Sequence, residues 1–161
     1  MIAGGPLVLT AVTALGCAVV GGILLAFSAL VMGALGRLPA AKGIAAMQSI
    51  NRRAVTPVFM ALLFGTALAC AAVVALGAAR WGEPYSARLV VGGGLYLLGV
   101  MFSTAAFHVP RNDALAGLDP DSPGAGQRWD RYRRSWTAGN HVRALAAVAA
   151  SAVLLSALRA A

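Results

Sequence analysis

Residues 6–35 read PLVLTAVTALGCAVVGGILLAFSALVMGAL, an apolar run without one charged side chain. About 20 consecutive apolar residues let an α-helix cross the hydrocarbon core of a bilayer, so this run is long enough to span with tilt. Three further apolar runs follow, at about 54–79, 89–107 and 138–158. The pattern predicts an all-α fold, an integral membrane four-helix bundle, and residues 1–161 then form a single transmembrane domain.

The composition excludes an ordinary soluble domain. Hydrophobic residues make up 60% of the 161 and charged residues only 11%, against about 25% charged in a typical soluble protein. The net charge of +8 does not indicate a nucleic-acid partner, because the basic residues flank apolar runs and form no stripe on a soluble surface. Membrane lipids are the partners that this distribution predicts. The first run lacks the basic n-region of a signal peptide, so we expect it to remain as a span; Ala26-Phe27-Ser28 leaves cleavage as the alternative.

Basic residues are unevenly divided between the two sides of the predicted bundle. Nine lysines and arginines lie in the segments 36–53 and 108–137, against three in the remaining loop and at the C-terminal end. Loops rich in lysine and arginine stay in the cytoplasm. We therefore expect a multi-pass protein of the cell inner (plasma) membrane. Both basic segments would be cytoplasmic loops, and both termini would lie on the outer side.

Polar side chains approach the fourth span along one helical face. Trp129, Tyr132, Trp136, Asn140 and Arg143 follow one another at intervals of three or four residues, which places them on one stripe of a helix. An interfacial helix before the fourth span, with aromatic side chains among lipid headgroups, is one interpretation. Asn140 and Arg143 lie deeper, where a polar group normally faces the bundle interior. The stripe favours a pocket at the cytoplasmic end of the bundle, with Arg143 in contact with Asn51 and Asn112.

Other candidate site residues fall on the same side of the membrane. Gln48 and Asn51 share a helical face at the entry to the second span, where they line the pocket or simply form helix-entry hydrogen bonds. Asn112 and Asp113 follow Pro110, where they serve the site or cap a short helix.

The two histidines, His108 and His141, also lie at the predicted cytoplasmic end of the bundle. With Asp113 they could form a facial metal triad, but no single element has the spacing of a ligand set. We expect no metal. Cys17 and Cys70 lie in apolar runs without a C-x-x-C spacing and are expected to be inert. Gly92-Gly93-Gly94 lies inside a span and follows no strand, so it indicates close helix packing and not a phosphate loop.

The residues at this end resemble the anthrone oxygenase family, a group of small four-helix membrane proteins. The resemblance runs from about Ala26 to Arg143, and the second half is its more specific part. It rests on AFS at 26–28, VM at 31–32, LPA at 38–40, GIAAMQSIN at 43–51, PVFM at 57–60 and VPRNDALA at 109–116, followed by Trp129, Tyr132, Trp136, Asn140 and Arg143. The chain departs from the family at His108, where asparagine is usual, at Gly33, where proline is common, and at Arg52-Arg53, which replaces a more apolar pair.

The resemblance implies that the protein oxidises a flat, lipophilic aromatic polyketide anthrone to a quinone with dioxygen, without flavin, metal or other cofactor. In that reaction Trp129 and Trp136 would stack on the substrate, and Gln48 and Asn51 would line its pocket. Arg143, Asn140 and Asn112 would hold the phenolate or carbonyl oxygen. Asp113 and His108 are the candidates for the base, and substrate acidity increased by Arg143 is the alternative to either.

A second class of function explains the same pocket without proton transfer. The protein would then be a non-catalytic membrane protein that binds a lipophilic small molecule or assists a partner protein. The sequence also leaves open a homo-oligomer. A flavin or nicotinamide oxidoreductase is disfavoured, because the sequence has no dinucleotide-binding fingerprint.

Overall fold

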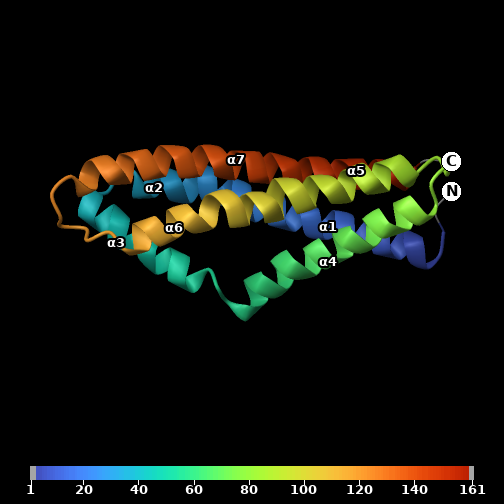
Figure 1. Cartoon of the computed structure of the whole chain (residues 1–161), viewed down its shortest axis with the longest axis horizontal. Coiled ribbons are helices and arrows are strands. Elements are labelled where there is room, and N and C mark those ends of the chain that lie inside the picture. The colour runs from blue at the N-terminus through green and yellow to red at the C-terminus, as the bar shows by residue number, and fades with distance from the viewer. Residues whose placement is uncertain (1–2, 160–161) are drawn as a thin grey trace.

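The computed structural model describes residues 3–159, and over this range it is a bundle of long helices without a strand (Figure 1). Four helices of the described range are long and apolar enough to cross a membrane: Gly5–Leu35, Pro57–Ala79, Ser86–Ala116 and Ala125–Ala157. They confirm the predicted all-α membrane bundle. The elements in chain order are α1 (Gly5–Ala26), η1 (Phe27–Val31), α2 (Met32–Leu35), α3 (Ala40–Arg53), α4 (Pro57–Ala79), α5 (Ser86–Tyr96), η2 (Leu97–Phe102), η3 (Thr104–His108), α6 (Val109–Ala116) and α7 (Ala125–Ala157), where η marks a π-helical segment.

Three of the four long helices exceed the thickness of a membrane. The first, third and fourth contain 31, 31 and 33 residues, or about 47–50 Å at about 1.5 Å per residue, whereas the hydrocarbon core is about 30 Å thick. α4 has 23 residues and fits that thickness more closely. At the end opposite the termini, α2, α3 and α6 lie together with the start of α7 (Figure 1). We call this end the cap; it consists of α2, α3, α6 and residues 125–137 of α7.

The cap has an apolar core of its own. Met32, Ile44, Met47, Leu115 and Trp129 are among the buried side chains that form it. A separate core fills the membrane part of the bundle, where the residues are mainly aliphatic and small. The bundle therefore has two separate packed regions along its length, one in the cap and one in the rest of the bundle.

The segments 36–53 and 108–137, which we expected to connect the spans as loops, are largely helical: they contain α3, α6 and the first turns of α7. α3 is an amphipathic helix. It buries Gly43, Ile44 and Met47 against the bundle and exposes Lys42 and Arg52. Only three residues of the segment are buried, so its apolar periodicity was too weak to predict a helix from the sequence. The interfacial helix expected before the fourth span is continuous with that span, since α7 runs unbroken from Ala125 to Ala157.

The third span also continues beyond its predicted end. Pro110 indicated a stop at Phe107, because proline has no N–H for the helical ladder and clashes with the preceding turn. The helix instead passes through η2 and η3 before Pro110 occupies the first turn of α6. The wider π-helical turns accommodate the missing hydrogen bond, as local π adjustments do around prolines in membrane helices.

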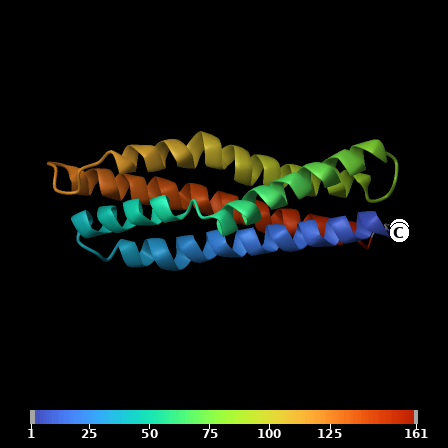
Figure 2. The same cartoon turned by 90° about the horizontal axis from the view of Figure 1, so that it is seen from below.

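A bend between α3 and α4 shapes the cap's junction with the membrane. Pro57 begins α4, and Thr56 before it is extended, with φ −87° and ψ 147°, which is the conformation that a following proline imposes. The Thr56 hydroxyl accepts a hydrogen bond from the Phe59 N–H at 3.4 Å and caps α4. α3 and α4 consequently form an open V with its apex away from the other helices (Figure 1). Viewed from below, they run end to end, with α1 along one side and the third span along the other (Figure 2).

Candidate functional site

A pocket lies inside the V, where the cap joins the membrane bundle. Its volume is about 310 Å³, at the lower end of the range of about 300–1,000 Å³ that is usual for small-molecule sites. Aliphatic and aromatic side chains of the first, third and fourth spans, α3 and α4 make up most of its wall, and four polar residues interrupt them. We call it the bend pocket; its aromatic residues are Phe27, Phe59, Phe64 and Trp136, and its polar residues are Asn51, Thr104, Asn112 and Arg143.

Arg143 supplies the only charge among the residues that line the bend pocket. Its side chain is 7% exposed, so its charge has left water and must be compensated by protein groups or a ligand. One terminal nitrogen, Nη1, donates to the Thr104 hydroxyl at 3.0 Å, and Nη2 donates to Asn140 Oδ1 at 2.5 Å. Its buried Nε has no hydrogen-bond partner among residues 3–159. No carboxylate lines the pocket, so the guanidinium keeps an uncompensated positive charge there.

Asn140 anchors Arg143 to the first span. Its side chain is fully buried, and its Nδ2 donates to the Leu24 carbonyl at 2.7 Å and to the Ser28 hydroxyl at 2.6 Å. Both acceptors belong to the first span, close to where α1 gives way to the π-helical turn η1. With its two N–H groups used, Asn140 presents its oxygen to Arg143 and holds the guanidinium in place.

Asn112 connects two aromatic side chains of α7 to the pocket. Its Oδ1 accepts a hydrogen bond from the Tyr132 hydroxyl at 2.9 Å and another from Trp136 Nε1 at 2.9 Å. The Trp136 ring lies 5.2 Å from the Phe27 ring, and the Arg143 guanidinium lies 5.6 Å from its centroid. Trp136 therefore presents a fixed aromatic wall beside the cation.

The structure buries the whole stripe on α7, including the aromatic side chains for which a position among lipid headgroups was the alternative. Trp129, Tyr132, Trp136, Asn140 and Arg143 are all at most 9% exposed. The partners of Arg143 differ from the expectation, because it bonds Thr104 and Asn140. Asn51 and Asn112 line the same pocket without a hydrogen bond to it.

Gln48 and Trp129 lie in the cap core and not in the lining of the bend pocket. The Gln48 amide donates to the carbonyls of Leu115 at 2.9 Å and Leu118 at 2.8 Å, so it satisfies the free end of α6. Trp129 stacks on Tyr132 with ring centroids 5.8 Å apart. Both side chains therefore stabilise the cap.

Neither candidate base lines the bend pocket. Asp113 is exposed on α6. His108 is 1% exposed and packs edge-on against Trp136 at 5.4 Å. Its Nδ1 lies 3.2 Å from the Ser103 carbonyl, and its Nε2 has no partner in the described part of the chain. His108 therefore contacts the Trp136 ring without lining the bend pocket.

The residues that could hold a metal are not assembled. His141 is exposed, whereas His108 is buried. Over residues 3–159, no three histidine, cysteine, aspartate or glutamate side chains come close enough to share an ion.

Sequence reasoning missed Thr104 and Ser28. A threonine or serine in a membrane helix commonly bonds the carbonyl one turn earlier, and Thr104 does so with Val100 at 2.6 Å. Its second role, as acceptor for Arg143, depends on packing between two distant helices. No pattern within its own span signals that contact.

Comparison with known proteins addresses this same region. The family model described as anthrone oxygenase matches residues 52–153, from the end of α3 into α7. This match covers more than half of the chain and includes Thr104, Asn112, Trp136, Asn140 and Arg143. No curated protein and no solved structure matches the chain. The chain belongs to the anthrone oxygenase family.

Proposed function

We propose that the protein oxidises a flat aromatic polyketide-type ketone to a quinone with dioxygen in the bend pocket, as an oxygenase without a cofactor. The observation that carries the proposal is the placement of the Arg143 guanidinium. It lies in an aromatic pocket that no carboxylate lines, and its buried Nε has no partner in residues 3–159. A fixed cation with a free donor suits a substrate oxygen that becomes anionic.

The walls of the pocket suit a flat apolar substrate. Trp136 and Phe27 lie next to each other, with ring centroids 5.2 Å apart, and Phe59 and Phe64 contribute two further rings from α4. Aromatic rings prefer offset or edge-on contacts with one another, so a fused-ring ligand gains both buried area and orientation here. Val55 at the bend and Phe64 on α4 are 71% and 56% exposed. They give a lipophilic substrate an apolar approach from the bilayer.

The reaction needs only a proton transfer and charge stabilisation from the protein. Loss of a proton from the methylene between two aromatic rings gives a carbanion whose charge reaches the ketone oxygen. The carbanion passes one electron to dioxygen, and the radical and superoxide recombine into a carbon–oxygen bond. Protonation gives a hydroperoxide; loss of the second methylene hydrogen and cleavage of the O–O bond then give the quinone and water. One oxygen atom enters the product, as in a monooxygenase.

Arg143 activates the substrate by lowering the energy of its anion. A guanidinium beside the ketone oxygen stabilises the enolate form, which makes the methylene proton more acidic. Asn112 and Asn51 add amide groups to the same pocket. Water or a substrate phenolate can then accept the proton, so the proposal does not require Asp113 or His108 in the pocket.

We further propose that the cap is cytoplasmic and both termini are outside, in the cell inner (plasma) membrane. Segments 36–53 and 108–137, which lie at the cap end of the bundle, contain nine basic residues. The opposite end of the bundle has three. This asymmetry supports the orientation through the preference of basic loops for the cytoplasm.

Incubation of the purified protein with emodin anthrone under ¹⁸O₂ tests the activity. We expect quinone formation above that of membranes without the protein, with one ¹⁸O atom in each new carbonyl. Tight binding of the anthrone without quinone formation above that control would instead assign the protein to the non-catalytic binding class.

A further inference from the structure

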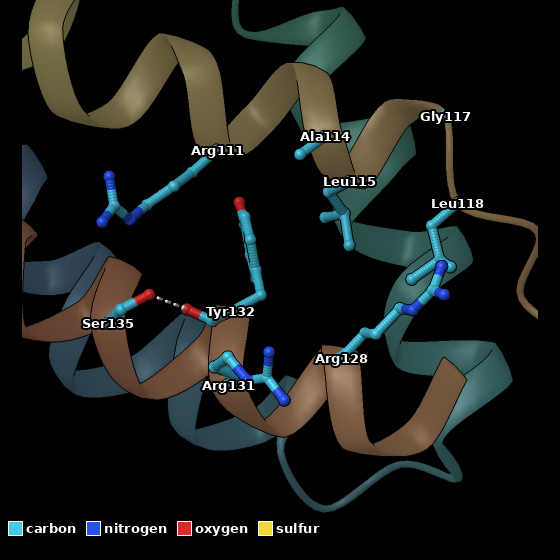
Figure 3. A pocket seen from close by; sticks show the side chains of 9 residues that line it. All are labelled: Arg111, Ala114, Leu115, Gly117, Leu118, Arg128, Arg131, Tyr132 and Ser135. Atoms are coloured by element: carbon cyan, nitrogen blue, oxygen red, sulfur yellow. Dashed lines mark hydrogen bonds between the residues drawn. The ribbon is translucent and has the colours of Figure 1, made fainter. Parts of the chain in front are cut away.

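A second pocket lies in the cap, between α6 and the first turns of α7 (Figure 3). Its volume is about 610 Å³. The Tyr132 ring stands between the two helices (Figure 3), and its hydroxyl donates a hydrogen bond to Asn112, which lines the bend pocket. We call it the cap pocket; it is distinct from the bend pocket, because the two share no lining residue.

Three arginines border the cap pocket, and no carboxylate does. Arg111 extends from α6, and Arg128 and Arg131 extend from α7 (Figure 3). Within residues 3–159, the Arg128 and Arg131 side chains form no hydrogen bond or ion pair. Arg111 donates to the Phe107 carbonyl at 2.9 Å and lies 3.4 Å above the Phe107 ring, which leaves other N–H groups of its guanidinium available.

The nearest acids along these helices do not neutralise the arginines. Asp113 lies two residues after Arg111, about 200° around α6, and therefore faces away from it. Asp130 is similarly placed relative to Arg128, and its carboxylate pairs instead with Arg133 at 3.5 Å. The cap pocket therefore keeps a net positive charge and favours an anion.

The rest of the wall is apolar. Ala114, Leu115 and Leu118 line it between the arginines. A small inorganic anion would leave these side chains without a contact, whereas an amphiphile with an anionic group would use both kinds of surface. The position of the cap pocket also favours an amphiphile, because α6 directly continues the third span and so places the pocket next to the spanning helices. Its Val109 and Asn112 face the bend pocket, and its Arg111 and Leu115 face the cap pocket.

We propose that the cap pocket is a binding site for a phosphate group, held by Arg111, Arg128 and Arg131. Guanidinium groups bind phosphate oxygens through paired N–H donors. The phosphate of an anionic phospholipid headgroup fits the apolar wall, and a soluble phosphate ester has the same chemistry. The site is independent of the proposed oxidation, since none of its residues lines the bend pocket.

Native mass spectrometry of the full-length protein tests the site. The protein is released from nanodiscs that contain phosphatidylglycerol and phosphatidylcholine with identical acyl chains, and the bound lipid is counted. We expect preferential retention of phosphatidylglycerol. Arg111→Gln, Arg128→Gln and Arg131→Gln, combined in one chain, should remove this preference, with binding about fivefold weaker for each arginine removed.

A matched triple variant controls for total charge. Arg37, Arg52 and Arg53 are exposed and lie outside the cap pocket, so their replacement by glutamine should leave the lipid preference intact. Equal losses in both triple variants, or an unchanged preference in the pocket variant, would overturn a lipid phosphate at this site. A second arm adds glycerol 3-phosphate to detergent-purified protein. Arginine-dependent binding of glycerol 3-phosphate without any lipid preference would assign the site to a soluble ester, and no binding in either arm would overturn the proposal.

Discussion

Asn112 serves two buried donors at once. Its Oδ1 accepts from the Tyr132 hydroxyl and from Trp136 Nε1, each at 2.9 Å. Asn112→Leu leaves both donors without this acceptor, and an unsatisfied buried donor costs about 1–3 kcal/mol. We expect a lower free energy of unfolding, seen as earlier thermal denaturation in detergent. Asp113→Leu, at the exposed neighbouring position, is the control and should change the denaturation temperature little. Equal stability of Asn112→Leu and the wild type would show that these bonds are not important.

Single residues also show where sequence reasoning reaches its limit. Asn140 and Arg143 stood out because polar groups inside an apolar span are costly, and both are buried as predicted. Their partners Ser28 and Thr104 did not stand out, because small hydroxyl residues are tolerated anywhere in a membrane helix. The sequence also placed Gln48 among pocket residues, although its amide closes the end of α6. Residue types indicated where polar groups gather, but not which of them meet.

At the scale of elements, the spanning helices and the helix that leads into the fourth span were predictable, α6 was one of two alternatives, and α3 was not expected. Long apolar runs identify the spans because few other structures satisfy backbone hydrogen bonds in lipid. α3 and α6 contain charged residues and few buried ones, so their segments resembled loops. The bend itself follows from Thr56-Pro57, but its consequence, a pocket between α4 and the bundle, depends on how α3 packs against α6 and α7.

The three adjacent glycines of α5 give an element-scale prediction. A Cβ on Gly93 would lie 2.7 Å from the Cys70 carbonyl oxygen of α4, whereas a Cβ on Gly94 would meet no atom within 4 Å. Gly93→Ala should therefore push α5 away from α4 and lower the free energy of unfolding by about 1–3 kcal/mol. Gly94→Ala should leave it unchanged or raise it slightly, since alanine is the better helix former. Thermal denaturation of the two variants in one detergent compares them, and an equal effect would contradict the close approach of the helices.

For the whole molecule, the orientation in the membrane is the prediction to test. Pro123→Cys, in the connection between the cap helices α6 and α7, and Glu83→Cys at the other end introduce thiols at exposed positions. The native Cys17 and Cys70 are fully buried. A membrane-impermeant maleimide added to intact cells should label Glu83→Cys and not Pro123→Cys until the cells are opened. The reverse pattern would place the cap outside and contradict the proposed topology.

The central claim is that the Arg143 guanidinium stabilises the substrate anion in the bend pocket, and kcat/KM for anthrone oxidation by Arg143→Lys tests it most directly. Lysine keeps the charge but lacks the planar set of donors that Thr104 and Asn140 orient. We predict a loss of about 10²-fold or more, with folding retained by size-exclusion chromatography. Arg134→Lys, an exposed change on the same helix, should stay within about twofold of the wild type. Full turnover by a folded Arg143→Lys protein would contradict the account.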